Sequence, residues 1–214
     1  MPELSYYGTY ADFRTESKRD GAILMNADCI VGDRYEIEIS TENGSRTAWL
    51  KNKFGARVGY FDEKTCYELS LCEAKGWKLV GILSFVAFSE EPEPGRYWGQ
   101  AAIISYPDIH SELFDPFVER VRKLISTGTR PQLKLGQQAF AELQKAPENW
   151  IPNGREPMPA RDRGTVILKS REKFSEKLIE QGRKKNVGCY VVSWVFLLAV
   201  VTLVLFGLKS CGLF

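Results

Sequence analysis

The chain has 214 residues, of which 26% are charged and 44% hydrophobic, and its formal net charge is +2. The charge is unevenly divided: residues 1–146 carry 18 Lys and Arg against 21 Asp and Glu, whereas residues 147–214 carry 11 against 6. The mildly acidic first part argues against a broad nucleic-acid-binding face. One histidine and five irregularly spaced cysteines, with no CxxC pair, argue against a zinc site, and no cofactor is expected.

The first sixty residues indicate a meander of short antiparallel strands. Four segments are expected to be strands: 22–27, 35–40, 47–50 and 56–61. The second of these alternates apolar and acidic residues, which is typical of a strand with one face in water. Asn43 and Gly44 favour a tight hairpin turn, because this pair readily adopts positive φ.

The middle of the chain alternates helices and longer strands. Asp62 is expected to cap a helix that ends at Gly76. The two most hydrophobic strands follow at 77–88 and 97–106, and an acidic, proline-rich loop joins them.

Apolar residues then recur at helical spacing over 113–125, in a helix that begins at Ser111 or at Asp115 and Pro116 and ends at Gly128. Residues 132–135 are expected to be a short strand and 137–145 a last helix. Together, residues 1–146 are expected to form one domain.

The rest of the chain predicts an anchor. Residues 147–168 hold several prolines and are expected to be a linker, whose Trp150 either docks on the domain or is recognised by a partner. A basic helix is expected over 169–186, lying on a membrane surface or continuing into the next helix. Residues 187–208 carry no charge and are expected to form a transmembrane helix, with 209–214 across the membrane.

Basic residues before this run set its expected orientation. Arg183, Lys184 and Lys185 favour a cytoplasmic N-terminal domain and are candidates for contact with anionic lipid. Cys189 is either an acylation site or a small apolar residue of the helix. The expected localisation is therefore a single-pass, tail-anchored membrane protein, with membrane lipid as one partner.

No catalytic motif, phosphate-binding loop or metal-ligand cluster is present, so an enzyme is not expected. Four basic residues lie close together in the sequence among aromatic ones: Arg46, Lys51, Lys53 and Arg57. They are candidates for nucleic-acid binding, since cations contact phosphates and aromatic rings stack on bases. The alternative is a solvated basic hairpin.

Residues 32–88 resemble a HIRAN domain, a small β-barrel with an inserted helix. The features shared are a GDRYEIEI strand, a polar turn, the short strand TAWL, a glycine-containing turn, the strand VGYF, a helix from Asp62, and Gly76 before a long apolar strand. The family carries an Asn-Pro-Tyr-Asp type motif that holds a DNA 3′ end. The corresponding turn here is TENGSRT, so no DNA-binding residue is carried over.

The expected fold class is α+β: a small antiparallel barrel or bent sheet with two or three helices, plus one C-terminal transmembrane helix. The expected function is a non-enzymatic module that binds a protein partner. The alternative is a membrane-tethered barrel that binds nucleic acid or another ligand.

Overall fold

The computed structural model describes residues 5–27, 29–42, 44–91, 93–160, 163–173, 196–198 and 200. The chain divides into two compact units, Met1–Lys173 and Phe174–Phe214. The fold described below is that of the first unit.

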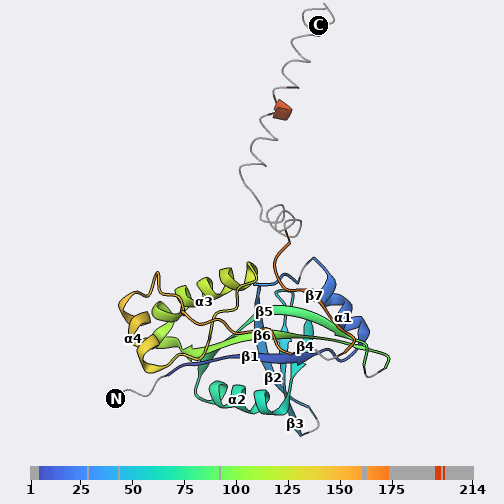
Figure 1. The fold of residues 1–214 in the computed structure, drawn as a ribbon, viewed down its shortest axis with the longest axis horizontal. Coiled ribbons are helices and arrows are strands. Elements are labelled where there is room, and N and C mark those ends of the chain that lie inside the picture. The colour runs from blue at the N-terminus through green and yellow to red at the C-terminus, as the bar shows by residue number, and fades with distance from the viewer. Residues whose placement is uncertain are drawn as a thin grey trace, which may run out of the picture. The chain divides into compact units, whose positions relative to one another are not determined.

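Six antiparallel strands form a closed barrel (Figure 1). They are β1 (Tyr7–Arg14), β2 (Arg34–Glu42), β3 (Ser45–Lys51), β4 (Arg57–Phe61), β5 (Trp77–Ser89) and β6 (Arg96–Pro107). Their order is β2-β3-β4-β1-β6-β5, and pairing between Tyr35 of β2 and Gly81 of β5 closes the circle. The sequence-based choice between a barrel and an open, bent sheet is thereby resolved in favour of the barrel.

Turn chemistry sets how the first strands pair. Glu42 of β2 lies opposite Ser45 of β3, and Gly44 between them has a φ of 78°. This short connection brings Glu38 opposite Trp49 and Glu36 opposite Lys51 on the outer face of the barrel. The predicted hairpin is confirmed.

The barrel interior is an apolar core. Phe13, Leu50 and Ile103 are among its fully buried or nearly fully buried residues. Two helices extend this core: α1 (Lys18–Met25) contributes Leu24, and α2 (Glu63–Ala74) contributes Leu69. Helix α1 follows the end of strand β1, whereas helix α2 lies near the start of β1.

Helix α2 begins and ends as its sequence predicts. The Asp62 side chain accepts a hydrogen bond from the Thr65 backbone N–H at 2.9 Å, and Gly76 has a φ of 69°. These are the N-cap and the left-handed residue that commonly limit a helix.

A second core lies outside the barrel. Helix α3 (Ser111–Ser126) places Phe114, Phe117 and Val121 against the outer face of β5 and β6, and α4 (Gln137–Lys145) adds Leu143. Figure 1 shows α3 and α4 together on this side of the strands. Strands β5 and β6 are therefore covered on both faces, which explains their nearly continuous apolar sequence.

The segment expected to be a linker packs on the domain. The Trp150 ring lies 5.9 Å from that of Phe117 between centroids, and its indole N–H donates to Glu142 at 3.0 Å. Arg120 of α3 donates to the backbone carbonyls of Pro147, Glu148 and Trp150. Strand β7 (Thr165–Lys169) then pairs with the second half of β5.

Three sequence-based assignments are wrong. Residues 22–27 lie largely in helix α1, capped by Ser17, because a short apolar run is equally compatible with a helix. Residues 132–135 are not a strand; instead, Pro131 forms an isolated bridge with Arg155. The part of the chain that the structure describes also has more helices than the two or three expected, since α1 to α4 are all present.

The expected transmembrane helix over 187–208 is also contradicted. Among the described residues, no helix is both long enough and apolar enough to cross a membrane. From that range the structure describes the helical residues Phe196, Leu197, Leu198 and Val200, and the remainder lies outside the described residues.

Residues 170–173 of the expected basic helix are not helical. The rest of that expected helix, 174–186, lies outside the described residues, and with it Arg183, Lys184 and Lys185. The acylation candidate Cys189 also lies outside them.

Candidate functional site

The four basic residues proposed for nucleic-acid binding do not form a free cationic patch. The Arg57 guanidinium bonds Glu38 at 2.6 Å and Glu42 at 2.9 Å, and Lys51 lies 2.5 Å from the second oxygen of Glu38. Lys53 is turned toward Asp33, at 3.9 Å. Arg46 is exposed at the other end of β3.

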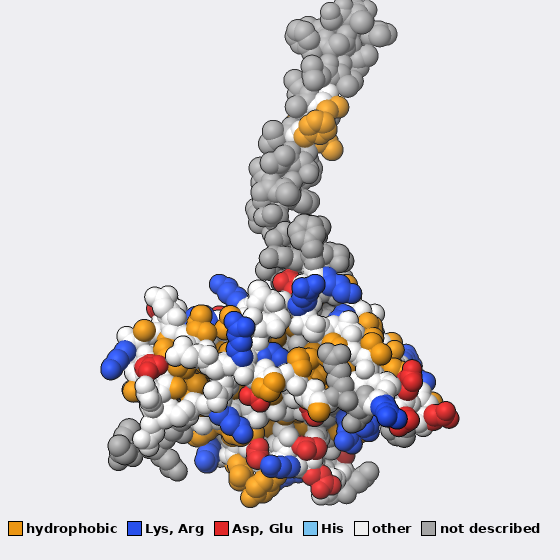
Figure 2. Space-filling view, viewed as in Figure 1, with side chains coloured by type: hydrophobic (Ala, Val, Ile, Leu, Met, Phe, Trp, Pro, Cys, Tyr) orange, Lys and Arg blue, Asp and Glu red, His pale blue; other side chains and the backbone are white. Residues whose placement is uncertain are grey.

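These ion pairs change the protonation equilibria of the cluster. Hydrogen bonds from Lys51 and Arg57 lower the pKa of Glu38, and the same bonds raise the pKa of both basic groups. Each partner is thus held in its charged form, and much of the positive charge is neutralised locally. Acidic and basic side chains are likewise interspersed over the face shown in Figure 2.

The aromatic residues of the same hairpin are only partly available. Arg57 lies over the Trp49 ring, 4.7 Å from its centroid, and Trp49 is 6% exposed. Its indole N–H donates to Ser40 at 2.9 Å. Phe54 is 65% exposed, but Trp49 is covered and does not offer a stacking platform for a base.

A different site stands out beside β7 and the segment that follows α3. A cavity of about 680 Å³ lies there, within the size range of small-molecule sites. The described residues that line it come from the segment directly after α3, from Met158, and from β7 with its continuation: Thr127, Gly128, Arg130, Met158, Thr165, Val166, Ile167, Ser170 and Arg171. Two are arginines, three carry hydroxyls, and none is acidic.

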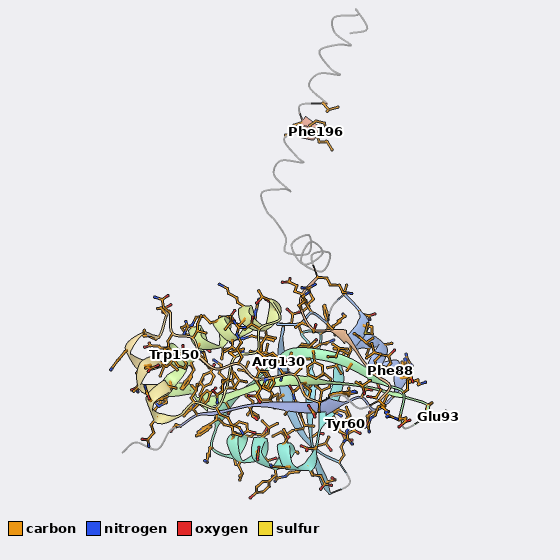
Figure 3. The ribbon with its side chains drawn as sticks, in the orientation of Figure 1. Tyr60, Phe88, Glu93, Arg130, Trp150 and Phe196 are labelled. Atoms are coloured by element: carbon orange, nitrogen blue, oxygen red, sulfur yellow. The ribbon has the colours of Figure 1, made fainter. Side chains whose placement is uncertain are left out.

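Arg130 is the most unusual of these residues. It is 7% exposed, and its guanidinium lies over the ring of Tyr10, at 4.4 Å, and over that of Phe85, at 5.6 Å. Figure 3 shows it in the middle of this face, over the strands of the barrel. Stacking on aromatic faces is a common environment for a guanidinium.

The hydrogen bonding of Arg130 is incomplete. One terminal nitrogen donates to the side-chain oxygen of Gln100, and the other to the sulfur of Met158, a weak acceptor, at 3.1 Å. Its Nε is buried and has no hydrogen-bond partner within the part of the chain that the structure describes. The salt bridges found among those residues do not include Arg130.

Burial of this cation has an electrostatic consequence. Loss of water around it lowers the pKa of the Arg130 guanidinium, while electrostatic and hydrogen-bonding interactions with Tyr10, and the more distant carboxylates of Glu156 and Asp12, act in the opposite direction. Buried cations are usually paired, because an unpaired one loses its solvation without compensation. An anion in the cavity that Arg130 lines would add a compensating negative charge beside this guanidinium.

Backbone contacts hold the cavity walls in place. The Glu156 N–H donates to the Arg130 carbonyl at 2.8 Å, and the Gln132 N–H donates to that of Gly154 at 2.9 Å. The Glu172 N–H donates to the Ser126 carbonyl at 2.9 Å, which ties the segment after β7 to the end of α3. At this rim, a Cβ on Gly128 would lie 3.6 Å from Cβ of Arg171.

Arg130 could not be recognised as a site residue from the sequence, for a physical reason. The cavity is assembled from three segments that lie up to 44 positions apart, and no local spacing marks them as one site. The apolar and hydroxyl residues around it are ordinary strand and loop residues. No cluster of three or more metal-ligating side chains is found in the described part of the chain.

Comparisons of the chain with models of protein families, with curated proteins and with solved structures give no match. The closed six-stranded antiparallel barrel is therefore established by the structure alone. It is compatible with the small barrel that the HIRAN resemblance over 32–88 implies, but no comparison names that family.

Proposed function

We propose that this protein is a non-enzymatic binding module that recognises an anionic group in the cavity beside Arg130. The observation that carries the proposal is the buried Arg130 guanidinium, whose Nε has no partner among the described residues. A buried donor without a partner costs roughly 1–3 kcal/mol, and more when it is charged. A carboxylate or phosphate bound in the cavity would place negative charge beside this guanidinium and so offset part of the cost of burying it.

The chemistry of the cavity supports binding rather than catalysis. Its described lining contains hydroxyls and two arginines but no carboxylate, histidine or cysteine. A serine or threonine needs an adjacent base to act as a nucleophile. The same set of donors is well suited to an oxyanion, since arginine recognises carboxylate and phosphate through several parallel hydrogen bonds.

Thermal unfolding of the full-length protein with simple anions tests this proposal. Benzoate and phenyl phosphate should raise the melting temperature, because a ligand that binds only the folded state stabilises it. The uncharged analogue benzyl alcohol should have little effect. Arg130→Gln should abolish the response to both anions, whereas Arg46→Gln, at an exposed arginine outside the cavity, should leave it unchanged.

The Arg130→Lys variant controls for loss of the fold in Arg130→Gln. It retains the positive charge but loses the planar fork, so it should fold and respond weakly to the anions. If the wild type shows no stabilisation by either anion, or if Arg130→Gln responds as strongly as the wild type, the proposal is wrong.

We also propose that the barrel is of the HIRAN type. The order β2, β3, β4, α2, β5 follows the order of features on which the resemblance over 32–88 was based. The barrel also needs β1 and β6, which lie outside that stretch. This proposal concerns the fold lineage and carries no DNA-binding residue with it.

A further inference from the structure

We infer that the group recognised beside Arg130 is a phosphate monoester with a small apolar or aromatic substituent, in preference to a carboxylate. The inference deepens the proposed function and depends on it. It is based on the number of charges, the donors and the size of the same cavity.

The described lining of the cavity carries two positively charged side chains. Arg130 and Arg171 both line it, and none of the lining residues that the structure describes is acidic. A carboxylate would compensate one of these two positive charges. A phosphate monoester carries between about −1.5 and −2 at pH 7 and therefore compensates both.

The two arginines occupy different depths. Arg130 is buried, donates to the sulfur of Met158 and lies over Tyr10, whereas Arg171 is exposed and lies beside Gly128 at the rim. Arg130 is therefore the fixed anchor, and Arg171 can close over a ligand from the solvent side. A tetrahedral group with three terminal oxygens can contact donors from both directions, which a planar carboxylate cannot do as well.

Hydroxyl groups provide further donors around the arginines. Thr127, Thr165 and Ser170 all line the cavity. The Thr127 hydroxyl now donates to the Leu124 carbonyl, and Thr165 shares a hydrogen bond with Ser89, in which either hydroxyl is the donor. Phosphate oxygens are strong acceptors for such groups.

The size and apolar part of the cavity indicate the rest of the ligand. A volume of about 680 Å³ is much larger than a phosphate ion needs. Met158, Val166 and Ile167 supply an apolar wall, and Val166 is 55% exposed. A phenyl-sized substituent would cover this surface, with a gain of roughly 25 cal/mol for each Å² of apolar area buried.

Calorimetric titration of the full-length protein compares phenyl phosphate with benzoate at equal ionic strength. At pH 7.5, phenyl phosphate should bind at least about tenfold more tightly, because it makes more charge-assisted hydrogen bonds. Its affinity should fall between pH 7.5 and 5.5, as its second proton binds with a pKa of about 6. Benzoate remains singly charged over this range, so its affinity should stay nearly constant.

Substitutions separate the roles of the two arginines. Arg171→Gln should remove most of the preference, because it weakens phenyl phosphate binding far more than benzoate binding. Arg130→Gln should abolish binding of both, and Arg46→Gln should change neither. Since Arg171 is exposed at the rim, its substitution should leave the fold intact, as circular dichroism can verify.

The outcomes distinguish this inference from the proposed function. If benzoate binds as tightly as phenyl phosphate and both depend on Arg130, the cavity is a general anion site and the phosphate inference is wrong. If neither ligand binds, the proposed function fails as well. Inorganic phosphate alone should bind more weakly than phenyl phosphate; equal affinity would contradict the role given to the apolar wall.

A final pair of probes identifies the source of the phosphate ester. Phenyl phosphate represents a free small molecule, and a short peptide containing phosphotyrosine represents a modified side chain of a protein partner. Tighter binding of the peptide than of phenyl phosphate would assign the site to a protein partner, and equal or weaker binding would assign it to a small molecule. Both results are consistent with phosphate monoester chemistry.

Discussion

At the scale of single residues, two buried or half-buried arginines behave in opposite ways. All three guanidinium nitrogens of Arg120 donate to backbone carbonyls, of Pro147, Glu148 and Trp150. Arg130 is more deeply buried, yet its Nε has no partner in the described structure. The first pattern stabilises a fold, whereas the second leaves a charged group incompletely paired in an apolar surrounding.

Arg120→Ala should therefore lower the free energy of unfolding by about 2 kcal/mol, since hydrogen bonds to a charged donor are worth roughly 1.5–3 kcal/mol and this side chain is partly screened by water. Urea denaturation measures the change. The matched control is Arg122→Ala on the same helix, whose exposed contact with Glu119, at 3.7 Å, should be worth less than about 1 kcal/mol. Equal losses of unfolding free energy in the two variants would show that the contacts of Arg120 with the carbonyls of Pro147, Glu148 and Trp150 do not stabilise the fold.

At the scale of secondary-structure elements, helix α2 carries a pH-sensitive cap. A hydrogen bond from Thr65 lowers the pKa of the Asp62 carboxyl below its ordinary value. A lowered folded-state pKa means that the stabilisation is fully present above the ordinary Asp pKa and is lost as the pH falls through the folded-state value.

Asp62→Ala should cost about 1 kcal/mol at pH 7, as expected for loss of an N-cap. Asp62→Asn should retain much of the cap but lose less stability than the wild type when the pH is lowered from 7 to 3. Urea denaturation at the two pH values provides the comparison, with Glu63→Gln as a neighbouring control. An Asn variant with the same acid sensitivity as the wild type would exclude this carboxyl as a source of the pH dependence.

The sequence predicted those elements whose signals are local. Asp62 and Gly76 mark α2, the turn before Ser45 marks the first hairpin, and the apolar spacing marks α3. From that hairpin, the pairing of Lys51 with Glu36 could also have been predicted. Strand β1 was missed because its sequence, YGTYADFR, has no clear alternation, and its place is determined by pairing with the distant β4 and β6.

At the scale of the whole molecule, the barrel and the cavity outside it are formed by different kinds of contact. Hairpin contacts and the inner core build the barrel, while the segment after α3, Met158 and β7 line a cavity on its outside. Only the first of these was accessible from the sequence, since the cavity depends on how distant segments pack. The hydropathy of 187–208 was likewise a local signal, and it led to a transmembrane helix that is not found among the described residues.

Charge pairing over the barrel predicts weak interaction with nucleic acids. Because Lys51, Lys53 and Arg57 face carboxylates, fluorescent single-stranded DNA should bind no more tightly than about 10⁻⁴ M at physiological salt, the weak end of non-specific binding. Salt-sensitive micromolar binding, lost when Arg46, Lys51, Lys53 and Arg57 are changed to Glu, would show instead that the hairpin is a nucleic-acid site.

The most direct test of the central claim follows the Nε–H group of Arg130 itself by NMR. Its ¹⁵N–¹H resonance in the full-length protein can be assigned by its absence from the spectrum of Arg130→Lys. During titration with phenyl phosphate, we expect this resonance to shift progressively and to saturate, because a dianion then lies beside the guanidinium. A resonance that stays in place while the ligand saturates the protein would show that Arg130 does not bind the anion, and would contradict the account.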